Sequence, residues 1–282
     1  MIVMKHALVF QTDFGLVDGA VCAMYGVANS IDPTLKIYDL THDIPQYNIW
    51  EASYRLRQTI DYWPEGTVFV SVVDPGVGST RRSVIARTQR NQYIITPDNG
   101  TLTHIKRIEG IESVRTFDEK VNKLPTAGES FTFFGRDIYA FNGAKLAAGQ
   151  IDYEHFGKTV PVESLVELPI VPAYREDHHV QGTIDVLDVR FGNLWTNIDH
   201  QLFHELDVAR GDRLAVKIKN DTRTVYENTV VFAQSFAEVA IGEPLLYINS
   251  LENIGVAINQ GSFAKAYNIG TGTNWRLSLC KA

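Results

Sequence analysis

The sequence lacks the features of a disulfide-rich, metal-binding, nucleic-acid-binding or membrane-spanning protein. Its two cysteines, Cys22 and Cys280, are too few and too far apart among 282 residues for a disulfide framework or a zinc site. The formal net charge is −7, and Lys and Arg form no run beyond isolated pairs, which argues against a nucleic-acid groove. No apolar stretch is long enough to span a bilayer. We therefore expect no metal, no nucleic-acid partner and no membrane partner.

The remaining composition is that of an ordinary globular protein. The chain is 45% hydrophobic and 21% charged, and its length suits two compact domains. Residues 1–10 run directly into Asp13 and have the pattern of a first strand rather than a signal peptide. We therefore expect a cytoplasmic protein.

Residues 1 to about 150 alternate between strand and helix patterns. The patterns predict strands at 7–12, 34–40, 68–73, 83–87 and 92–96, and helices at 18–30, 50–60 and 137–148, the last closed by Gly149. This alternation predicts an α/β domain with a mainly parallel sheet and helices packed on it.

From about residue 180 short strand patterns dominate. They lie at 181–188, 212–219, 224–231, 244–249 and 274–279, with one possible helical turn near 201–206. Such spacing predicts an all-β sandwich or a small barrel. Three prolines, Pro161, Pro169 and Pro172, mark the connection between the two patterns. We therefore predict an α/β domain at 1–165, a linker at 166–180 and a barrel-like β domain at 181–282.

The most informative segment runs from Asp74 to Arg82, with the sequence DPGVGSTRR, and follows an apolar, β-branched strand. Its proline and glycines end that strand, so Asp74 lies at a strand's carboxyl end with Arg81 seven positions on. Open α/β sheets bind ligands at that edge. The same residues also fit a structural turn in which Asp74 pairs with Arg81. A phosphate loop is disfavoured, because Asp74 would repel phosphate and the Walker spacing is absent.

Two further motifs leave a functional and a structural interpretation open. Asp13 and Asp18 follow the first predicted strand, where carboxylates can accept ribose hydroxyls or an ammonium group. Asp18 equally suits a helix N-cap. In the second domain, Phe191 and Trp195 with Asn193 suit either a stacking platform for a flat heterocycle or a core with a turn.

Taken in order, these blocks resemble the family of S-adenosylmethionine (SAM) hydroxide adenosyltransferases, together with its fluorinase and chlorinase relatives. The resemblance covers nearly the whole chain. It is carried by residues 12–15 with Asp18, 74–78, 97–100, 134–137, 191–197, and 249–250 with 259–262. It implies SAM as the substrate, with no separate cofactor, and a homotrimer in which the ligand lies between the α/β domain of one subunit and the barrel of its neighbour.

The resemblance also implies roles for residues of the α/β domain. Asp13 should hold the ribose hydroxyls, Asp18 the methionine ammonium, and Tyr47 should lie against the ribose. In the family's hydrolases an Asp-Arg-His triad orients the attacking water. Asp74 and Arg81 match two of its members, and Phe134 occupies the position of the histidine.

In the barrel domain the resemblance implies an adenine pocket and a carboxylate contact. Phe191 and Asn193 should receive the adenine, with Phe236 and Tyr247 completing the pocket. Ser250 should contact the methionine carboxylate. The halogenases follow this serine with an arginine, whereas this chain has Leu251, so carboxylate recognition must rely on other donors.

The nucleophile separates hydrolase from halogenase. Phe134 and Gly135 resemble the halogenases, and a helix starting near Gly135 would favour an anion. However, the halogenases have a tyrosine where this chain has Asp74. Repulsion between a carboxylate and a nearby halide costs several kcal/mol of electrostatic energy at an effective dielectric constant of about 20, and Arg81 offsets part of that cost.

We therefore predict an adenosine-forming SAM hydrolase. Without the histidine, Asp74 can still orient water, but a carboxylate beside an arginine is a weak base, so turnover should be slow. A chlorinase-type halogenase and a non-catalytic SAM- or adenosine-binding protein remain the alternatives.

Overall fold

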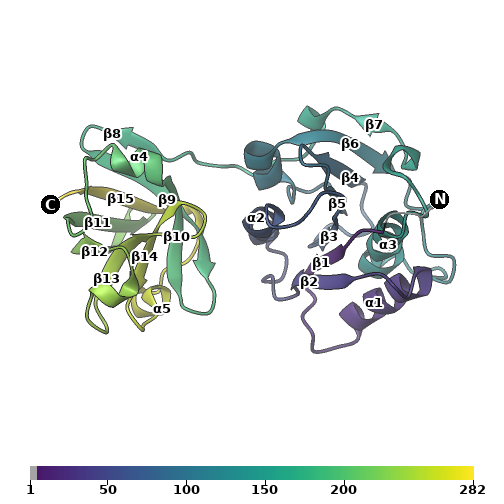
Figure 1. The fold of residues 1–282 in the computed structure, drawn as a ribbon, viewed down its shortest axis with the longest axis horizontal. Helices are drawn as coiled ribbons and strands as arrows, with labels where there is room; N and C mark the ends of the chain where they lie inside the picture. Colours follow the sequence, from purple (N-terminus) through teal and green to yellow (C-terminus); the bar gives the residue numbers. More distant parts are fainter. Residues whose placement is uncertain (1–4) are drawn as a thin grey trace. The chain divides into compact units, whose positions relative to one another are not determined.

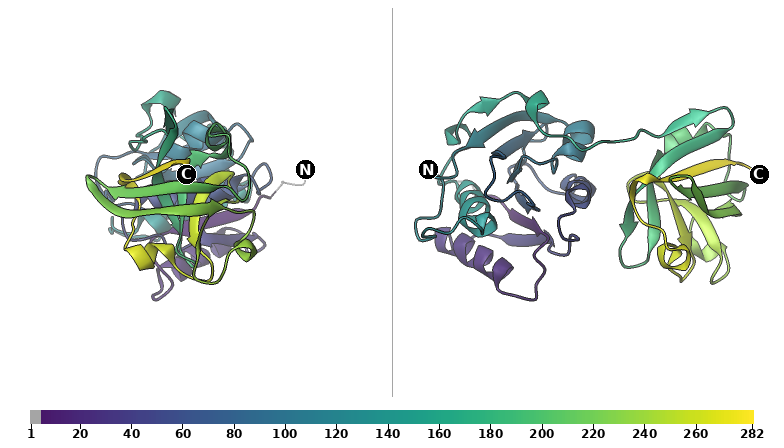
Figure 2. Two further views of the ribbon diagram at one scale, coloured as in Figure 1. Left: turned by 90° about the vertical axis from the view of Figure 1, so that its left-hand side faces the viewer. Right: turned by 180° about the vertical axis from the view of Figure 1, so that it is seen from behind.

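The computed structural model describes residues 5–282 and divides the chain into two compact units that join between Leu168 and Pro169. Figure 1 shows an α/β unit followed by an all-β unit, and Figure 2 shows the same units from two further sides. Residues 1–4 of the expected first strand lie outside the described residues.

The first unit is built on a seven-stranded sheet of order β2-β1-β3-β5-β4-β6-β7. The first four strands in this order are mutually parallel, and β4, β6 and β7 continue the sheet in antiparallel pairings. The predicted α/β class is confirmed. The strands are β1 Leu8–Thr12, β2 Ile37–Thr41, β3 Val68–Val72, β4 Ser83–Thr88, β5 Tyr93–Pro97, β6 Ile111–Phe117 and β7 Thr159–Val160.

Helices cover both faces of this sheet, so β1 and β3 are buried along their whole length. On one face α1 (Ala20–Ile31) and α3 (Phe141–Ala147) pack into one apolar cluster. On the other, α2 (Ile49–Ile60) and the π-helical turn η1 (Ile105–Glu109) form a second cluster. The Asn48 side chain accepts a hydrogen bond from Glu51 N at 3.0 Å and so caps α2.

The helix predicted at 137–148 differs from the observed one. It begins at Gly135 with a π-helical segment, η2 (Gly135–Ala140), and continues as α3 only to Ala147. Gly143 lies against β3, where a Cβ atom would come within 2.4 Å of Val70 Cγ2. Side-chain periodicity did not reveal the wider π turn, which is a short and rare departure from the α-helix.

The second unit is a closed seven-stranded barrel. Its strands run β10-β14-β13-β12-β11-β15-β9, and a β9–β10 pairing closes the ring, while β8 (Tyr174–Glu176) extends the β9 edge. Of the predicted sandwich or barrel, the barrel is observed. The strands are β9 His179–Asp188, β10 Asn193–Asp199, β11 Arg213–Asn220, β12 Arg223–Phe232, β13 Pro244–Ile248, β14 Asn253–Ile258 and β15 Gly272–Lys281.

Two short helices, α4 (His200–His204) and α5 (Phe263–Tyr267), complete this unit. β14 and α5 were not predicted from the sequence, nor was β6 in the first unit. β14 contains Gly255, at which a Cβ atom would come within 2.6 Å of the Tyr247 ring. The glycine weakens the strand pattern but permits this contact.

Residues of the predicted linker are shared between the two units. The backbone N–H of Val166 donates to Asp98 Oδ1 and that of Leu168 to Thr103 Oγ1, both at 2.9 Å, within the first unit. Tyr174–Glu176 instead pair with β9. Within residues 5–282, no helix has the length and apolar character needed to cross a membrane.

Candidate active site

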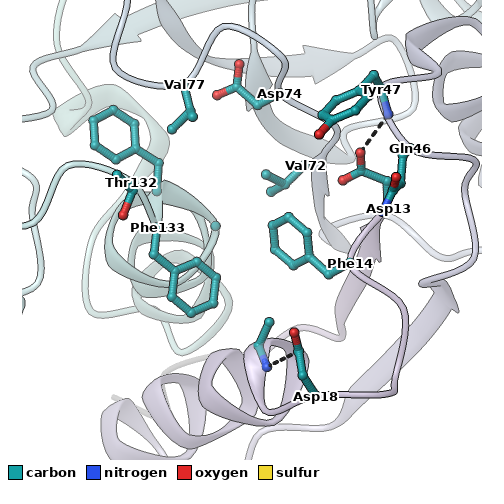
Figure 3. Close-up of a pocket in the computed structure, with 13 residues that line it drawn as sticks. Asp13, Phe14, Asp18, Gln46, Tyr47, Val72, Asp74, Val77, Thr132 and Phe133 are labelled. Carbon is teal, nitrogen blue, oxygen red and sulfur yellow. Dashed lines mark hydrogen bonds between the residues drawn. The ribbon is translucent and has the colours of Figure 1, made fainter.

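A cavity of about 470 Å³ lies at the carboxyl ends of β1 and β3 (Figure 3). Every residue of the α/β unit that was predicted to bind or act on the ligand lines it, except Arg81. The lining comprises Asp13, Phe14, Asp18, Ala20, Gln46, Tyr47, Val72, Asp74, Val77, Thr132, Phe133, Phe134 and Gly135. The cavity thus lies at the carboxyl ends of parallel strands, the edge at which sheets of this kind bind ligands.

The loop after β1 supplies two carboxylates in different settings. Asp13 Oδ2 accepts a hydrogen bond from Tyr47 N at 2.9 Å, with Tyr47 in the left-handed region at φ 66°. Asp18 Oδ1 accepts from Ala20 N, the first residue of α1, also at 2.9 Å. The N-cap of α1 is Gly19, so the N-cap interpretation of Asp18 is wrong, although Asp18 still accepts a hydrogen bond from the helix N-terminus and lines the cavity.

Asp74 and Arg81 form a buried ion pair at the cavity wall. Arg81 Nε lies 3.0 Å from both carboxylate oxygens of Asp74, and Nη2 lies 2.6 Å from Oδ2. The two side chains are only 4% and 10% exposed. Burial by itself would lower the pKa of the Arg81 guanidinium, but the hydrogen bonds and charges of its acidic partners raise it above the usual value. Arg81 therefore stays cationic and fixes the Asp74 carboxylate from behind.

The sequence analysis missed a second carboxylate on Arg81. Arg81 Nη1 donates to Glu119 Oε1 at 2.5 Å and to Ser83 Oγ at 3.2 Å, and Ser83 Oγ lies 2.8 Å from Tyr139 OH. Burial raises the pKa of Tyr139, which keeps this phenol neutral. Glu119 lies 38 positions from Arg81 in no recognisable motif, so only the fold could place it here.

Phe134 occupies the predicted histidine position as a core residue. It is 3% exposed, its ring centroid lies 5.4 Å from Arg81 Cζ, and it contacts the Phe131 ring. Beside it, Gly135 leaves room for Phe14, whose ring would lie 2.8 Å from an added Cβ. None of the residues that line this cavity is a histidine. The lining therefore combines three phenylalanines, Phe14, Phe133 and Phe134, with the Asp74 carboxylate.

The charge of this cavity favours a cation. Its lining contains three carboxylates, Asp13, Asp18 and Asp74, and no Lys, Arg or His. Only Asp74 is paired with an arginine, from outside the lining. A sulfonium or ammonium group would be stabilised in such a site, whereas a halide or phosphate would be repelled.

A second cavity of about 770 Å³ lies in the barrel unit and contains all the predicted barrel residues. Trp195 Nε1 donates to Tyr247 OH at 3.1 Å, and the Phe236 and Tyr247 ring centroids lie 5.1 Å apart. Phe191 is 68% exposed, so it is not a core residue. The lining comprises Asp188, Arg190, Phe191, Asn193, Trp195, Phe236, Tyr247, Asn249, Ser250, Ile258, Asn259, Gln260, Gly261 and Ser262.

This aromatic, amide-rich cavity suits a flat heterocycle. Burial raises the pKa of Tyr247 to about 12, so the phenol is neutral and remains a hydrogen-bonding group. The sequence analysis did not single out Arg190, which supplies the one cationic side chain in the linings of the two cavities. The sequence signal that could have pointed to Arg190 was its position directly before Phe191.

Comparison with known proteins identifies the family of both units. The family models for the SAM hydroxide adenosyltransferase N-terminal and C-terminal domains match residues 8–157 and 182–276. The chain belongs to the SAM hydroxide adenosyltransferase family. Within this family it is 34% identical to an (R)-S-adenosyl-L-methionine hydrolase of Salinispora tropica over 95% of this chain and 96% of that protein.

More distant and structural relatives span the same length. A fluorinase of Actinopolyspora mzabensis is 25% identical, with 97% of each chain covered. The crystal structure of an uncharacterized conserved protein from Thermotoga maritima superposes with a TM-score of 0.89 at 31% identity, covering 97% of this chain and all of that one. The SAM hydroxide adenosyltransferase fold therefore extends over both units. Residues 5–282 contain no group of three or more His, Cys, Asp and Glu side chains placed to hold a metal ion.

Proposed function

We propose that this protein is an S-adenosyl-L-methionine hydrolase that forms adenosine and L-methionine. The observation that carries the proposal is the Asp74 carboxylate on the wall of an acidic cavity, held by two guanidinium nitrogens of Arg81. Family membership and the hydrolase relatives support the same activity.

The reaction is a displacement at the ribose C5′. The oxygen of a water molecule forms a bond to C5′ while the C5′–S bond breaks and its electron pair goes to sulfur. Methionine leaves as a neutral thioether, so no general acid is needed, and the attacking oxygen loses one proton to Asp74 and then to solvent. The site has to align and desolvate the water rather than activate the leaving group. Asp74 can orient the water because an ionised carboxylate only accepts hydrogen bonds.

We further propose that each cavity holds one part of SAM. In the α/β cavity, Asp13 would hold the ribose hydroxyls against Tyr47, and Asp18 the methionine ammonium. In the barrel cavity, the adenine would lie among Phe191, Asn193, Phe236 and Tyr247, with Ser250 near the carboxylate. We also propose, as the family resemblance implies, a cytoplasmic homotrimer in which the barrel of one copy completes the α/β cavity of the next.

Arg190 is the donor that we propose for the methionine carboxylate. Leu251 follows Ser250 and offers no charge, while Arg190 lines the same cavity as Ser250. A carboxylate that is removed from water needs a cationic or multiple hydrogen-bonding partner.

The test is product analysis with SAM in the presence and absence of chloride. Purified protein should convert SAM to adenosine and methionine in equal amounts, unaffected by chloride, as measured by liquid chromatography and mass spectrometry. Because the Salinispora relative is named for the (R) epimer at sulfur, both sulfonium epimers should be assayed. Formation of 5′-chloro-5′-deoxyadenosine would instead identify a halogenase, and bound but intact SAM would identify a binding protein.

A further inference from the structure

A chain of hydrogen bonds that runs from the exposed Asp39 to the buried Thr12 lies directly behind Asp13. His42, in the loop after β2, has Nδ1 2.7 Å from Thr12 Oγ1 and Nε2 3.0 Å from Asp39 Oδ1. Tyr25 OH, from α1, lies 2.6 Å from Asp39 Oδ2. Thr12 is the last residue of β1 and is fully buried, and His42 is 4% exposed. The chain thus runs from α1 through β2 to the residue that precedes Asp13.

One arrangement of protons satisfies every member of this chain. The Asp39 carboxylate only accepts, so His42 Nε2–H and Tyr25 O–H both donate to it. His42 Nδ1 then carries a lone pair and accepts from the Thr12 hydroxyl. The Thr12 oxygen is left free to accept from Phe14 N, which lies 3.2 Å away. Burial raises the pKa of Tyr25, so its phenol keeps the proton that it donates.

His42 also holds the loop through its backbone. Gly15 N donates to His42 O at 2.8 Å, and Gly15 adopts φ 69°, a conformation that favours glycine. Five residues further along, Tyr47 N donates to Asp13 Oδ2. The β2–α2 loop therefore contacts the chain before Asp13, at Thr12, and after it, at Gly15. His42 makes both contacts, the first through its side chain and the second through its carbonyl oxygen.

We propose that His42 is a positioning residue for the SAM site, acting through Thr12 on the Asp13 carboxylate and on Phe14. A polar chain orients its end residue best when every member is bonded, and this chain ends at the backbone N–H of Phe14, which lines the cavity, with Asp13 held in the sequence between Thr12 and Phe14. The inference rests on the proposed function for the identity of the ligand. Its geometry rests on the observed contacts alone.

The first test compares His42→Ala with His42→Asn. The asparagine amide places an acceptor near the position of Nδ1 and can keep the bond to Thr12, whereas alanine cannot. His42→Ala should raise the Kd for adenosine and lower kcat/KM for SAM by about tenfold or more, because small displacements of binding groups are costly. His42→Asn should retain most of the adenosine affinity and most of kcat/KM for SAM. Binding is measured by titration calorimetry with adenosine, and turnover by adenosine release from SAM.

His104 provides a matched control. It is a buried histidine of the same unit, 3% exposed, and its Nδ1 lies 2.9 Å from Ser53 Oγ, but it does not line the cavity. His104→Ala should lower the melting temperature without changing adenosine affinity or kcat/KM. If His42→Ala lowered the melting temperature in the same way and left both quantities within twofold of the wild type, His42 would be merely structural.

A double-mutant cycle tests the route of the effect. In an Asp13→Asn background, His42→Ala should cause little further loss of adenosine affinity, because the effect of His42 is transmitted to Asp13. In an Asp18→Asn background the full tenfold cost should remain. Equal costs in both backgrounds would overturn the proposal. If the wild type bound adenosine but failed to hydrolyse SAM, the proposed function would fail, while the affinities would still decide the role of His42.

Discussion

Arg81 holds Asp74 through two guanidinium nitrogens, with Nε 3.0 Å from Oδ1 and Nη2 2.6 Å from Oδ2. Because Glu119 occupies Nη1 of the same guanidinium, Arg81 cannot turn away from Asp74 without leaving a buried charge unpaired. The carboxylate is therefore held in one orientation at the cavity wall. A nucleophile that donates hydrogen bonds can use such a carboxylate, and a halide cannot.

Replacing Asp74 should stop hydrolysis without preventing binding. In Asp74→Ala the water loses its acceptor, so kcat should fall by at least about 100-fold, while the SAM affinity changes little. Single-turnover adenosine formation and calorimetric titration with SAM measure the two effects. Unchanged turnover would refute the role of Asp74.

Asp98 offers a matched control for this variant. It is also a buried aspartate paired with an arginine, with Arg82 Nε 2.9 Å from its Oδ2, but it does not line the cavity. Asp98→Ala should destabilise the protein and spare kcat. An equal loss of kcat in both variants would mean that lost stability explains the result.

Restoring an imidazole at position 134 should speed the reaction. Phe134→His places a base near Asp74 and Arg81, and general-base assistance should raise kcat by about tenfold or more. Phe134→Leu controls for the loss of the aromatic ring in this buried position. The pre-steady-state rate of adenosine formation is the measurement. If His and Leu variants were equally slow, the missing histidine would not be what limits turnover.

Removing Arg190 should weaken recognition of the methionine carboxylate. Arg190→Ala should raise KM for SAM about tenfold with little change in kcat, since a charge-assisted hydrogen bond is lost from binding. A sulfonium analogue without the carboxylate should be insensitive to the substitution. Arg190→Lys should recover part of the affinity. Arg210→Ala, in an exposed residue of the same unit outside the cavity, is the control. Equal losses for SAM and the analogue would contradict this role.

The stability of the protein should depend on pH through the protonation of His104. Burial, and then the charges of Arg57 and Arg107, lower its pKa from 6.5 to about 4. The unfolded chain therefore binds a proton more readily than the folded protein between these values. The stability from His104 is complete above pH 6.5 and is lost as the pH falls toward 4, by about 3 kcal/mol. Urea unfolding of the wild type and His104→Gln should show a smaller loss for the variant, and parallel pH profiles would contradict the assignment.

Local patterns were sufficient to predict the fold class and most of the strands. The apolar run before Asp74 identified a strand covered on both faces, and β3 is fully buried. The switch to short strands near residue 180 predicted an all-β unit, either a sandwich or a small barrel. What local patterns could not supply was the closure of the barrel by β9 and β10, which are joined by the turn containing Gly192.

For the site, motif order found most of the residues given a role, including Arg81 behind Asp74, but not Arg190 in the barrel lining or Glu119 and His42 behind the α/β lining. Asp13, Asp74 and Phe191 stand in short motifs next to strand ends and line the cavities as expected. Glu119 and His42 stand outside the motifs that carry the resemblance, and they reach Arg81 and Thr12 only through the packing of distant segments. Their roles depend on tertiary contacts and leave no local signal in the sequence.

In the proposed reaction, a water molecule oriented by Asp74 attacks C5′ of SAM. Reaction in water enriched in ¹⁸O, followed by mass spectrometry of the nucleoside product, tests it directly. The account predicts adenosine that carries one ¹⁸O atom on its 5′ carbon, formed together with unlabelled methionine and lost in Asp74→Ala. A 5′-halogenated nucleoside, or adenosine without the label, would contradict it.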